Sequence, residues 1–395
     1  MNRARHWLGE PLHRNLTSVL VGLLTSLAWA GDINRAAAAA EVSPPANAPT
    51  QTLMLQPATG LSVRIDFDFQ FNKAPPPFAK EPALAGKEVV RGIIPTEPPT
   101  PFLRNISDNV LYLNTEHRPD FVDGKLAAYR SFYRGHVIFQ NLQLSSVRGE
   151  LTIPYTVDLY TYEHVCAGWL QVNSGWTGDL QVNGQKWRLG LVDNLDGQLD
   201  NEDILYLRRV DRQEAQRIQF KPPPKTLFLD GKTFDLAFVF RSGPTGAVIE
   251  ASLTERQPVL GQLNLQARGC RYFCLRSGDL AVLLDASKGT LPLPAGTYQI
   301  ADCLLEQEPD QSMPTTLVRC DTKVSVEPGQ TASLAVGLPL KNSLAVTRDR
   351  NLFRLTYQLL GAAGEQYEYY NWRDRPTFSV YKGPIRIGTG ALPYG

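Results

Sequence analysis

The chain has 395 residues, of which 43% are hydrophobic, and its formal net charge is +1. This length is sufficient for two or three domains, each with a sizeable core. A nearly neutral chain without a long basic run lacks the electrostatic footprint of nucleic-acid binding, so we expect no nucleic-acid partner. The 29 prolines and 31 glycines are spread among short apolar runs, which is typical of an all-β protein with many turns.

Residues 1–30 predict a signal peptide. Basic residues precede an apolar run over 16–30, and Ala28 and Ala30 place small side chains at the two positions that signal peptidase reads. A retained membrane anchor is the alternative, but the run is short for a span of about 20 residues. We therefore expect export to the periplasm or the cell exterior, no transmembrane anchor after cleavage, and a flexible spacer over 31–51.

Short runs of alternating or β-prone residues predict strands along the rest of the chain. In the first part they cover residues 61–71, 111–113, 137–144, 151–162, 187–191 and 204–207. In the second part they cover residues 263–265, 280–284, 293–300, 324–336, 353–360 and 377–387. We expect an all-β fold with two antiparallel β-sandwich-like regions in tandem, an N-terminal domain over 52–241 and an Ig-like or prealbumin-like domain over 246–395.

The stretch 180–207 contains the clearest local signal. Asn183-Gly184 predicts a two-residue hairpin turn, because both residue types tolerate positive φ at low steric cost. Beyond the turn, Trp187 and every second residue up to 191 are apolar, which is the pattern of a half-buried strand.

An internal similarity involves the same stretch. Residues 182–189 resemble residues 229–236, and residues 84–91 are a looser third copy. Leu-Tyr-Leu also occurs twice, at 111–113 and 205–207, each time beside a loop that contains Asp. The similarity reflects either a true duplication or the turn chemistry that hairpins share.

The C-terminal half contains a Leu-Pro-Ala-Gly-Thr-Tyr step at 293–298 and a Glu-Pro-Gly-Gln turn at 327–330. These resemble the corresponding turns of small exported modules of the transthyretin-like or carboxypeptidase-regulatory-like kind. Together with the predicted signal peptide and the Leu-Tyr-Leu segments, the order of elements is similar to that of uncharacterised exported bacterial β-sandwich proteins. The resemblance implies a fold and no activity.

A turn rich in Asp and Asn follows the predicted hairpin and is the candidate metal site. Ca²⁺ takes about six to eight oxygen ligands around a tight glycine turn. With Gly197 at the invariant glycine place of an EF-type loop, four side chains fall on ligand places: Asn194, Asp196, Asp200 and Asp203. However, Val192 stands at the first place, where a carboxylate is needed, and strands replace the flanking helices. The alternative, which we favour, is a turn whose Asp and Asn side chains cap their own backbone, with no cofactor.

Two tryptophans are candidate ligand-binding residues. Trp176 lies between Gly175 and Gly178, which predicts a loop with an exposed ring, and Trp372 belongs to a second aromatic group. Exposed aromatic rings stack on sugars, so a glycan is the ligand that these residues favour. The alternative is that both rings pack in the core.

Five cysteines follow the predicted signal peptide: Cys166, Cys270, Cys274, Cys303 and Cys320. In an exported chain we expect them to be disulfide partners rather than metal ligands, and an odd number leaves one thiol over. Cys303 and Cys320 lie in two strand-like runs that could be antiparallel neighbours, whereas Cys270 and Cys274 are too close in sequence to bridge within one strand.

Catalytic motifs are sparse. His117, His136 and His164 form no His-Glu-x-x-His, and Gly-x-Ser-x-Gly is absent from the sequence. A His164–Cys166 nucleophile lacks an orienting motif, and a hydrolase would need two carboxylates that converge in a cleft. We therefore expect a non-enzymatic structural or binding protein of unknown ligand. The alternative is a carbohydrate-binding or accessory protein of a polysaccharide-active system.

Overall fold

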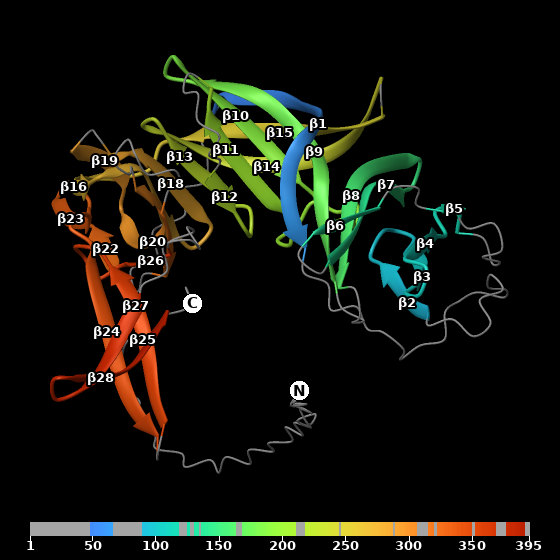
Figure 1. Ribbon diagram of the computed structural model, residues 1–395. Helices are drawn as coiled ribbons and strands as arrows, with labels where there is room; N and C mark the ends of the chain where they lie inside the picture. Colours follow the sequence, from blue (N-terminus) through green and yellow to red (C-terminus); the bar gives the residue numbers. More distant parts are fainter. Residues whose placement is uncertain are drawn as a thin grey trace, which may run out of the picture. The chain divides into compact units, whose positions relative to one another are not determined.

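The computed structural model describes residues 48–65, 89–117, 125–126, 130–133, 136–162, 168–210, 218–244, 246–286, 289–305, 315–319, 322–349, 352–368 and 377–391. All of them belong to the compact unit Val42–Gly395. The regular structure of these residues is built from strands, which confirms the predicted all-β class (Figure 1). Among them there is no helix that could cross a membrane. The predicted signal peptide lies outside the described residues.

The strands up to residue 220 are β1 (Thr50–Ile65), β2 (Val89–Ile94), β3 (Thr100–Asn105), β4 (Val110–Leu113), β5 (Lys125–Leu126), β6 (Arg130–Tyr133), β7 (His136–Arg148), β8 (Leu151–Tyr162), β9 (Gly168–Val182), β10 (Gln185–Val192), β11 (Ile204–Arg209) and β12 (Ile218–Phe220). Each run predicted in this part overlaps a strand, and the run 151–162 coincides with β8. Because β1 begins at Thr50, the last residues of the predicted spacer belong to a strand.

The later strands are β13 (Thr226–Leu229), β14 (Lys232–Gly243), β15 (Gly246–Arg256), β16 (Leu260–Arg268), β17 (Cys270–Ser277), β18 (Leu280–Asp285), β19 (Thr290–Pro294), β20 (Gly296–Leu305), β21 (Thr315–Arg319), β22 (Lys323–Val326), β23 (Thr331–Gly337), β24 (Lys341–Asp349), β25 (Leu352–Leu360), β26 (Gln366–Glu368), β27 (Thr377–Lys382) and β28 (Ile385–Ala391). The predicted run 293–300 is divided between β19 and β20.

Strand β9 organises the first part of the chain. From β6 to β12 each strand pairs antiparallel with the next, and β9 therefore pairs with β8 and β10. The second half of β1 pairs with the opposite edge of β9, since Val172 has Val157 of β8 on one side and Val63 of β1 on the other. A strand near the N-terminus thus becomes a neighbour of strands more than a hundred residues later.

The predicted domain boundary at 241–246 lies at the turn of a hairpin. Strands β14 and β15 pair antiparallel along almost their whole lengths, up to Gly243 opposite Gly246. The first half of β1 pairs with β15, with Leu55 opposite Ile249. Hydrogen bonding between strands therefore continues across this boundary.

Two hydrophobic cores share three strands. We call the buried cluster that contains Trp176 the first core and the cluster that contains Tyr298 the second core. On β13, Leu227 and Leu229 join the first core and Phe228 joins the second; β17 and β18 alternate in the same way. Strands that are buried on both faces have continuous apolar sequences, which hides the period of two.

The similar segments 182–189 and 229–236 each contain a hairpin turn, and the two turns contact each other. Asn183 and Gly184 have φ values of 46° and 79°, and Asp230 and Gly231 have φ values of 47° and 84°, as a type I′ turn requires. The predicted Asn183-Gly184 turn is thus confirmed. The Asn183 side-chain amide donates to the Asp230 carbonyl (2.7 Å), and the Trp187 indole donates to the Asp230 carboxylate (2.7 Å). The Ala-Gly turn of the third copy lies outside the described residues.

Candidate functional site

The acidic loop, residues 193–203, connects β10 to β11 and contains the side chains predicted to bind calcium. Three of them accept a hydrogen bond from the backbone N–H two residues further on: Asn194 from Asp196 (3.1 Å), Asp196 from Gln198 (2.7 Å) and Asp200 from Glu202 (2.7 Å). By this geometry Asn and Asp side chains stabilise a turn. One oxygen of each of these side chains is thus hydrogen-bonded to the loop itself.

Asp203 closes the acidic loop from its far end. Its side chain is only 1% exposed, and its two oxygens accept hydrogen bonds from the backbone N–H groups of Asn194 (3.1 Å) and Asp200 (2.7 Å). The described part of the chain contains no group of three or more His, Cys, Asp or Glu side chains that could hold a metal ion. The hydrogen bonds of Asp203 belong to a turn in which Asp and Asn side chains cap backbone N–H groups.

Asp193 connects the acidic loop to β8. Its Oδ1 accepts hydrogen bonds from the Tyr155 hydroxyl (2.7 Å) and from the backbone N–H groups of Leu195 (2.7 Å) and Gly197 (3.3 Å). Its Oδ2 is buried and has no hydrogen-bond partner among the described residues. Burial raises the pKa of Asp193 to about 7 and the pKa of Asp203 to about 8. Both carboxyls therefore stay protonated at pH values where an exposed aspartate is ionised.

The β7–β8 hairpin holds the backbone of the acidic loop. The Ser146 hydroxyl donates to the Leu195 carbonyl (2.6 Å), and the Arg148 guanidinium donates to the Asp196 carbonyl (2.9 Å). Gly197 has a φ of 74°, and a Cβ added there would lie 3.1 Å from the Ser146 Cβ. The turn and the close packing explain the glycine at this position without an ion.

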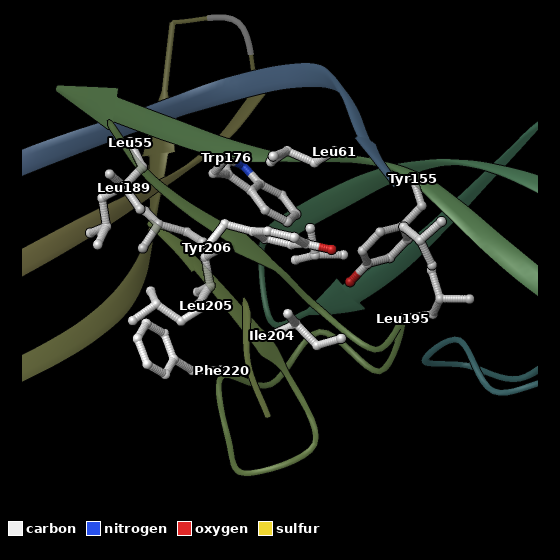
Figure 2. Packing of buried hydrophobic residues seen from close by; sticks show 14 of the residues in the cluster. Leu55, Leu61, Tyr155, Trp176, Leu189, Leu195, Ile204, Leu205, Tyr206 and Phe220 are labelled. Carbon is white, nitrogen blue, oxygen red and sulfur yellow. The ribbon is translucent and has the colours of Figure 1, made fainter. Parts of the chain in front are cut away.

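The predicted exposure of Trp176 is wrong. Its side chain is 2% exposed, lies inside β9, and donates from the indole N–H to the Ala247 carbonyl (2.8 Å). Figure 2 shows the ring among packed side chains that include Leu55 and Leu61. The flanking glycines do not form a loop: an added Cβ at Gly175 would meet Leu61 at 2.7 Å, and one at Gly178 would meet Leu55 at 2.8 Å. They make room for leucines of β1.

Trp169, which lies on the same strand as Trp176, also has neighbours on its ring. Trp169 stacks on Tyr160 with ring centroids 4.8 Å apart and planes 8° from parallel, and the Arg64 guanidinium lies 4.5 Å from the Trp169 ring. Because β8 and β1 lie on opposite edges of β9, these two contacts approach Trp169 from opposite sides. Trp187 is buried, and Trp372 lies outside the described residues.

A pocket of about 140 Å³ lies on the face of β9, β10 and β11 opposite to Trp187 and Leu189. We call it the arginine pocket; its lining residues are Ala58, Thr59, Leu61, Thr177, Arg188, Gly190, Tyr206 and Arg208. Strand register places the polar members together, because Arg188 is directly opposite Arg208 and Gly190 lies between Thr177 and Tyr206.

The arginine pocket has a surplus of positive charge. Arg188 donates two hydrogen bonds to Asp179 (2.8 and 3.2 Å), and Lys186 lies 2.8 Å from the same carboxylate. The bonds from Arg188 are the largest cause that lowers the pKa of Asp179 to about 2, so this carboxylate is ionised at neutral pH. Arg208 forms no ion pair with a described residue, which leaves one carboxylate for three cations.

Glycines and β1 shape the arginine pocket. The register of β1 against β9 shifts between Thr59 and Val63, and this irregularity places Leu61 over the sheet. An added Cβ at Gly190 would lie 3.4 Å from both Leu61 and Tyr206, which is van der Waals contact, so Gly190 forms the part of the lining between these two side chains. The sequence places Arg188 on the polar face of β10, but only the pairing of β10 with β11 brings Arg208 to it.

Comparison of the chain with family models, with curated proteins and with solved structures finds no match. What the arginine pocket can do therefore follows from its lining. Guanidinium and hydroxyl groups donate hydrogen bonds to an anion, and the described residues of the lining include no carboxylate, histidine or cysteine that would transfer a proton or attack a substrate.

Proposed function

We propose that this chain is a non-enzymatic binding protein of the periplasm or cell exterior, and that its arginine pocket accepts the carboxylate or sulfate of an anionic ligand. The observation that carries the proposal is the Arg188–Arg208 pair, directly opposite on neighbouring strands, with Asp179 as the one carboxylate of the described residues that is paired with it. Like charges at such positions destabilise a sheet. A bound anion removes that repulsion.

The donors of the arginine pocket suit an oxyanion. A guanidinium presents a planar fork of N–H groups that matches a carboxylate or sulfate. Arg188 uses two of its donors on Asp179, so Arg208 is the principal ligand-binding side chain. The hydroxyls of Thr59 and Thr177 lie in the same lining and supply further donors.

The volume of the arginine pocket restricts the ligand. Pockets for drug-sized molecules enclose about 300–1,000 Å³, so a pocket of about 140 Å³ holds an acidic group and little more. A uronic acid or sulfated sugar at the end of a glycan has such a group on an otherwise exposed ring. An anionic glycan therefore agrees with both the pocket and the alternative function in carbohydrate binding, without an exposed tryptophan.

Calorimetric titration of the full chain with D-glucuronate, D-glucose and inorganic sulfate tests the proposal. We expect the two anions to bind and glucose not to bind, and affinity to fall as the salt concentration rises. R208A should lose about tenfold or more in affinity, because it removes a charge-assisted hydrogen-bond donor.

R241A is the matched control. Arg241 is an exposed arginine on β14 that is paired with Glu250 (3.1 Å), away from the pocket lining. Its loss should leave anion binding unchanged. Equal binding of glucose and glucuronate, or equal losses in R208A and R241A, would contradict the proposal. A panel of acidic glycans without any binder would favour a purely structural role.

A further inference from the structure

Two cysteines from different strands meet in the second core. Cys270 is the first residue of β17 and Cys303 lies on the paired strand β20. Their Sγ atoms are 3.1 Å apart, and the two side chains are 8% and 1% exposed. This distance is longer than an S–S bond of about 2.05 Å and shorter than an ordinary contact between two sulfurs.

A register shift in β17 determines which of its two cysteines lies beside Cys303. Residues four apart on a regular strand share a face, so Cys270 and Cys274 would point the same way. The register of β17 against β20 shifts between Cys270 and Tyr272. As a result Cys270 joins the second core, where Cys303 lies, and Cys274 joins the first core.

The surroundings of the two sulfurs keep them together. A Cβ added at Gly337 would lie 2.7 Å from the Cys270 Sγ, so the missing side chain leaves room for the sulfur. On the other side the Tyr367 hydroxyl lies 3.9 Å from the Cys303 Sγ and donates to Glu365 at 2.8 Å. The pair is therefore enclosed by backbone and by a hydrogen-bonded tyrosine.

We infer that Cys270 and Cys303 form a disulfide in the mature protein. The reaction is exchange with a disulfide donor, such as oxidised glutathione or an oxidised dithiol protein. One cysteine loses its proton and attacks a donor sulfur, which releases one donor thiolate. The second cysteine, also deprotonated, attacks the mixed disulfide, so that the Cys270–Cys303 bond forms and the second donor thiolate leaves. The two protons end on the two donor thiols.

Burial of the two sulfur atoms limits the stage of folding at which the disulfide can form and the access of reductant to it. A donor cannot reach sulfurs that are enclosed in the second core, so exchange takes place before β17 and β20 are fully packed. The finished bond is shielded from reductant in the folded chain. It joins two neighbouring strands of one sheet and stabilises the fold chiefly by restricting the unfolded chain.

Tryptic peptide mapping without reductant tests the inference on the full chain. Arginine and lysine positions separate the relevant cysteines into the peptides 269–271 (Cys270), 272–276 (Cys274), 289–319 (Cys303) and 320–323 (Cys320). The chain is produced in an oxidising compartment or refolded with oxidised glutathione, blocked with an alkylating agent, and digested. We expect peptides 269–271 and 289–319 as one linked species, two hydrogens lighter than their sum.

Recovery of peptide 269–271 as an alkylated thiol from both preparations would overturn the inference. So would a link from peptide 289–319 to peptide 320–323, which is the Cys303–Cys320 pairing that the sequence suggests. This measurement needs no substitution, so a variant that fails to fold does not affect it.

Thermal melting gives a second measurement. The double variant C270A/C303A should melt several degrees below the oxidised chain. Reductant should lower the melting temperature of the oxidised chain only when the chain is first unfolded in its presence and then refolded. C274A is the matched control, because it removes a buried thiol on the opposite face of β17. Reductant should destabilise unfolded and refolded C274A as much as the parent chain. An oxidised chain that reductant never destabilises would contradict the bond.

Discussion

The acidic loop and the arginine pocket are both built on β10 and β11, yet their charged side chains differ in how far hydrogen bonds and opposite charges balance them. In the loop, Asp203 accepts hydrogen bonds on both oxygens from backbone N–H groups within ten residues, so local bonds satisfy this carboxyl. In the pocket, Arg188 and Arg208 are directly opposite each other through strand pairing, and among the described residues one carboxylate, Asp179, is paired with them. A cluster of charges therefore becomes a candidate binding site when the chain leaves it unbalanced, and the number of charges in a segment is a poor guide.

The largest effect that we expect comes from removing the buried cap of the loop. D203A leaves the backbone N–H groups of Asn194 and Asp200 without their acceptor, and it should lower the free energy of unfolding by about 2–4 kcal/mol. Urea denaturation measures this loss. D200A removes a single exposed cap and should cost less than about 1 kcal/mol. Equal losses in the two variants would show that Asp203 does not hold the loop together.

The buried carboxyls of the acidic loop and the carboxylate beside the arginine pocket should change the stability of the fold in opposite directions as pH changes. The pKa values of Asp193 and Asp203 are raised to about 7 and 8 in the folded chain, above the unfolded value of about 4. The folded chain therefore binds more protons than the unfolded chain between about pH 4 and pH 8, and stability falls as pH rises through this window. We expect the melting temperature to decrease by several degrees between pH 5 and pH 8.5.

Variants assign this pH dependence to the loop. D193N/D203N should flatten the decrease, because neither amide titrates. D179N should leave it unchanged, since the pKa of Asp179 is lowered to about 2 and its stabilising contribution is lost only as pH falls toward that value. A slope that persists in D193N/D203N would assign the pH dependence to other groups.

A smaller effect is expected from the single carboxylate beside the pocket. D179N removes the partner of Lys186 and Arg188 and increases the positive charge around the pocket. Glucuronate and sulfate should then bind about two- to fivefold more tightly, in proportion to a partly screened charge interaction. Titration calorimetry measures the change. Weaker binding in D179N would mean that Asp179 positions Arg188 for the ligand.

The smallest expected effect concerns calcium. Because Asn194, Asp196, Asp200 and Asp203 each direct at least one side-chain oxygen at a backbone N–H group, we expect millimolar calcium to leave the melting temperature unchanged. The same scan in EDTA is the reference. A rise that saturates with calcium, and that D200A abolishes, would show that these side chains turn to a cation.

Local patterns were sufficient for much of the fold. Every predicted run overlaps a strand, and Asn183-Gly184 forms the turn that its residues require. The prediction failed where glycine had a tertiary role. Trp176 was expected in a loop because of the glycines on either side, and these glycines instead accommodate leucines of β1. A glycine that frees a turn and a glycine that makes room for a distant side chain look the same in a single sequence.

The predicted boundary at 241–246 shows the same limit of local information. β15, just after the predicted boundary, alternates buried and less buried residues, so its local pattern resembles that of a strand in any half-buried sheet. Such a pattern does not tell which strands pair with each other. The β14–β15 hairpin and the pairing of β1 with β15 become visible only in the structure.

The all-β class, many strand positions and the two-residue hairpin turn follow from the sequence alone, because these features depend on neighbours a few residues apart. Which carboxyls are buried, which arginines face each other and which cysteines meet depends on the tertiary structure. Arg188 and Arg208 are joined by strand register, and Cys270 and Cys303 by an irregularity in β17. Such contacts depend on how distant strands align, and a shift of one residue in a strand moves its side chains to the other face.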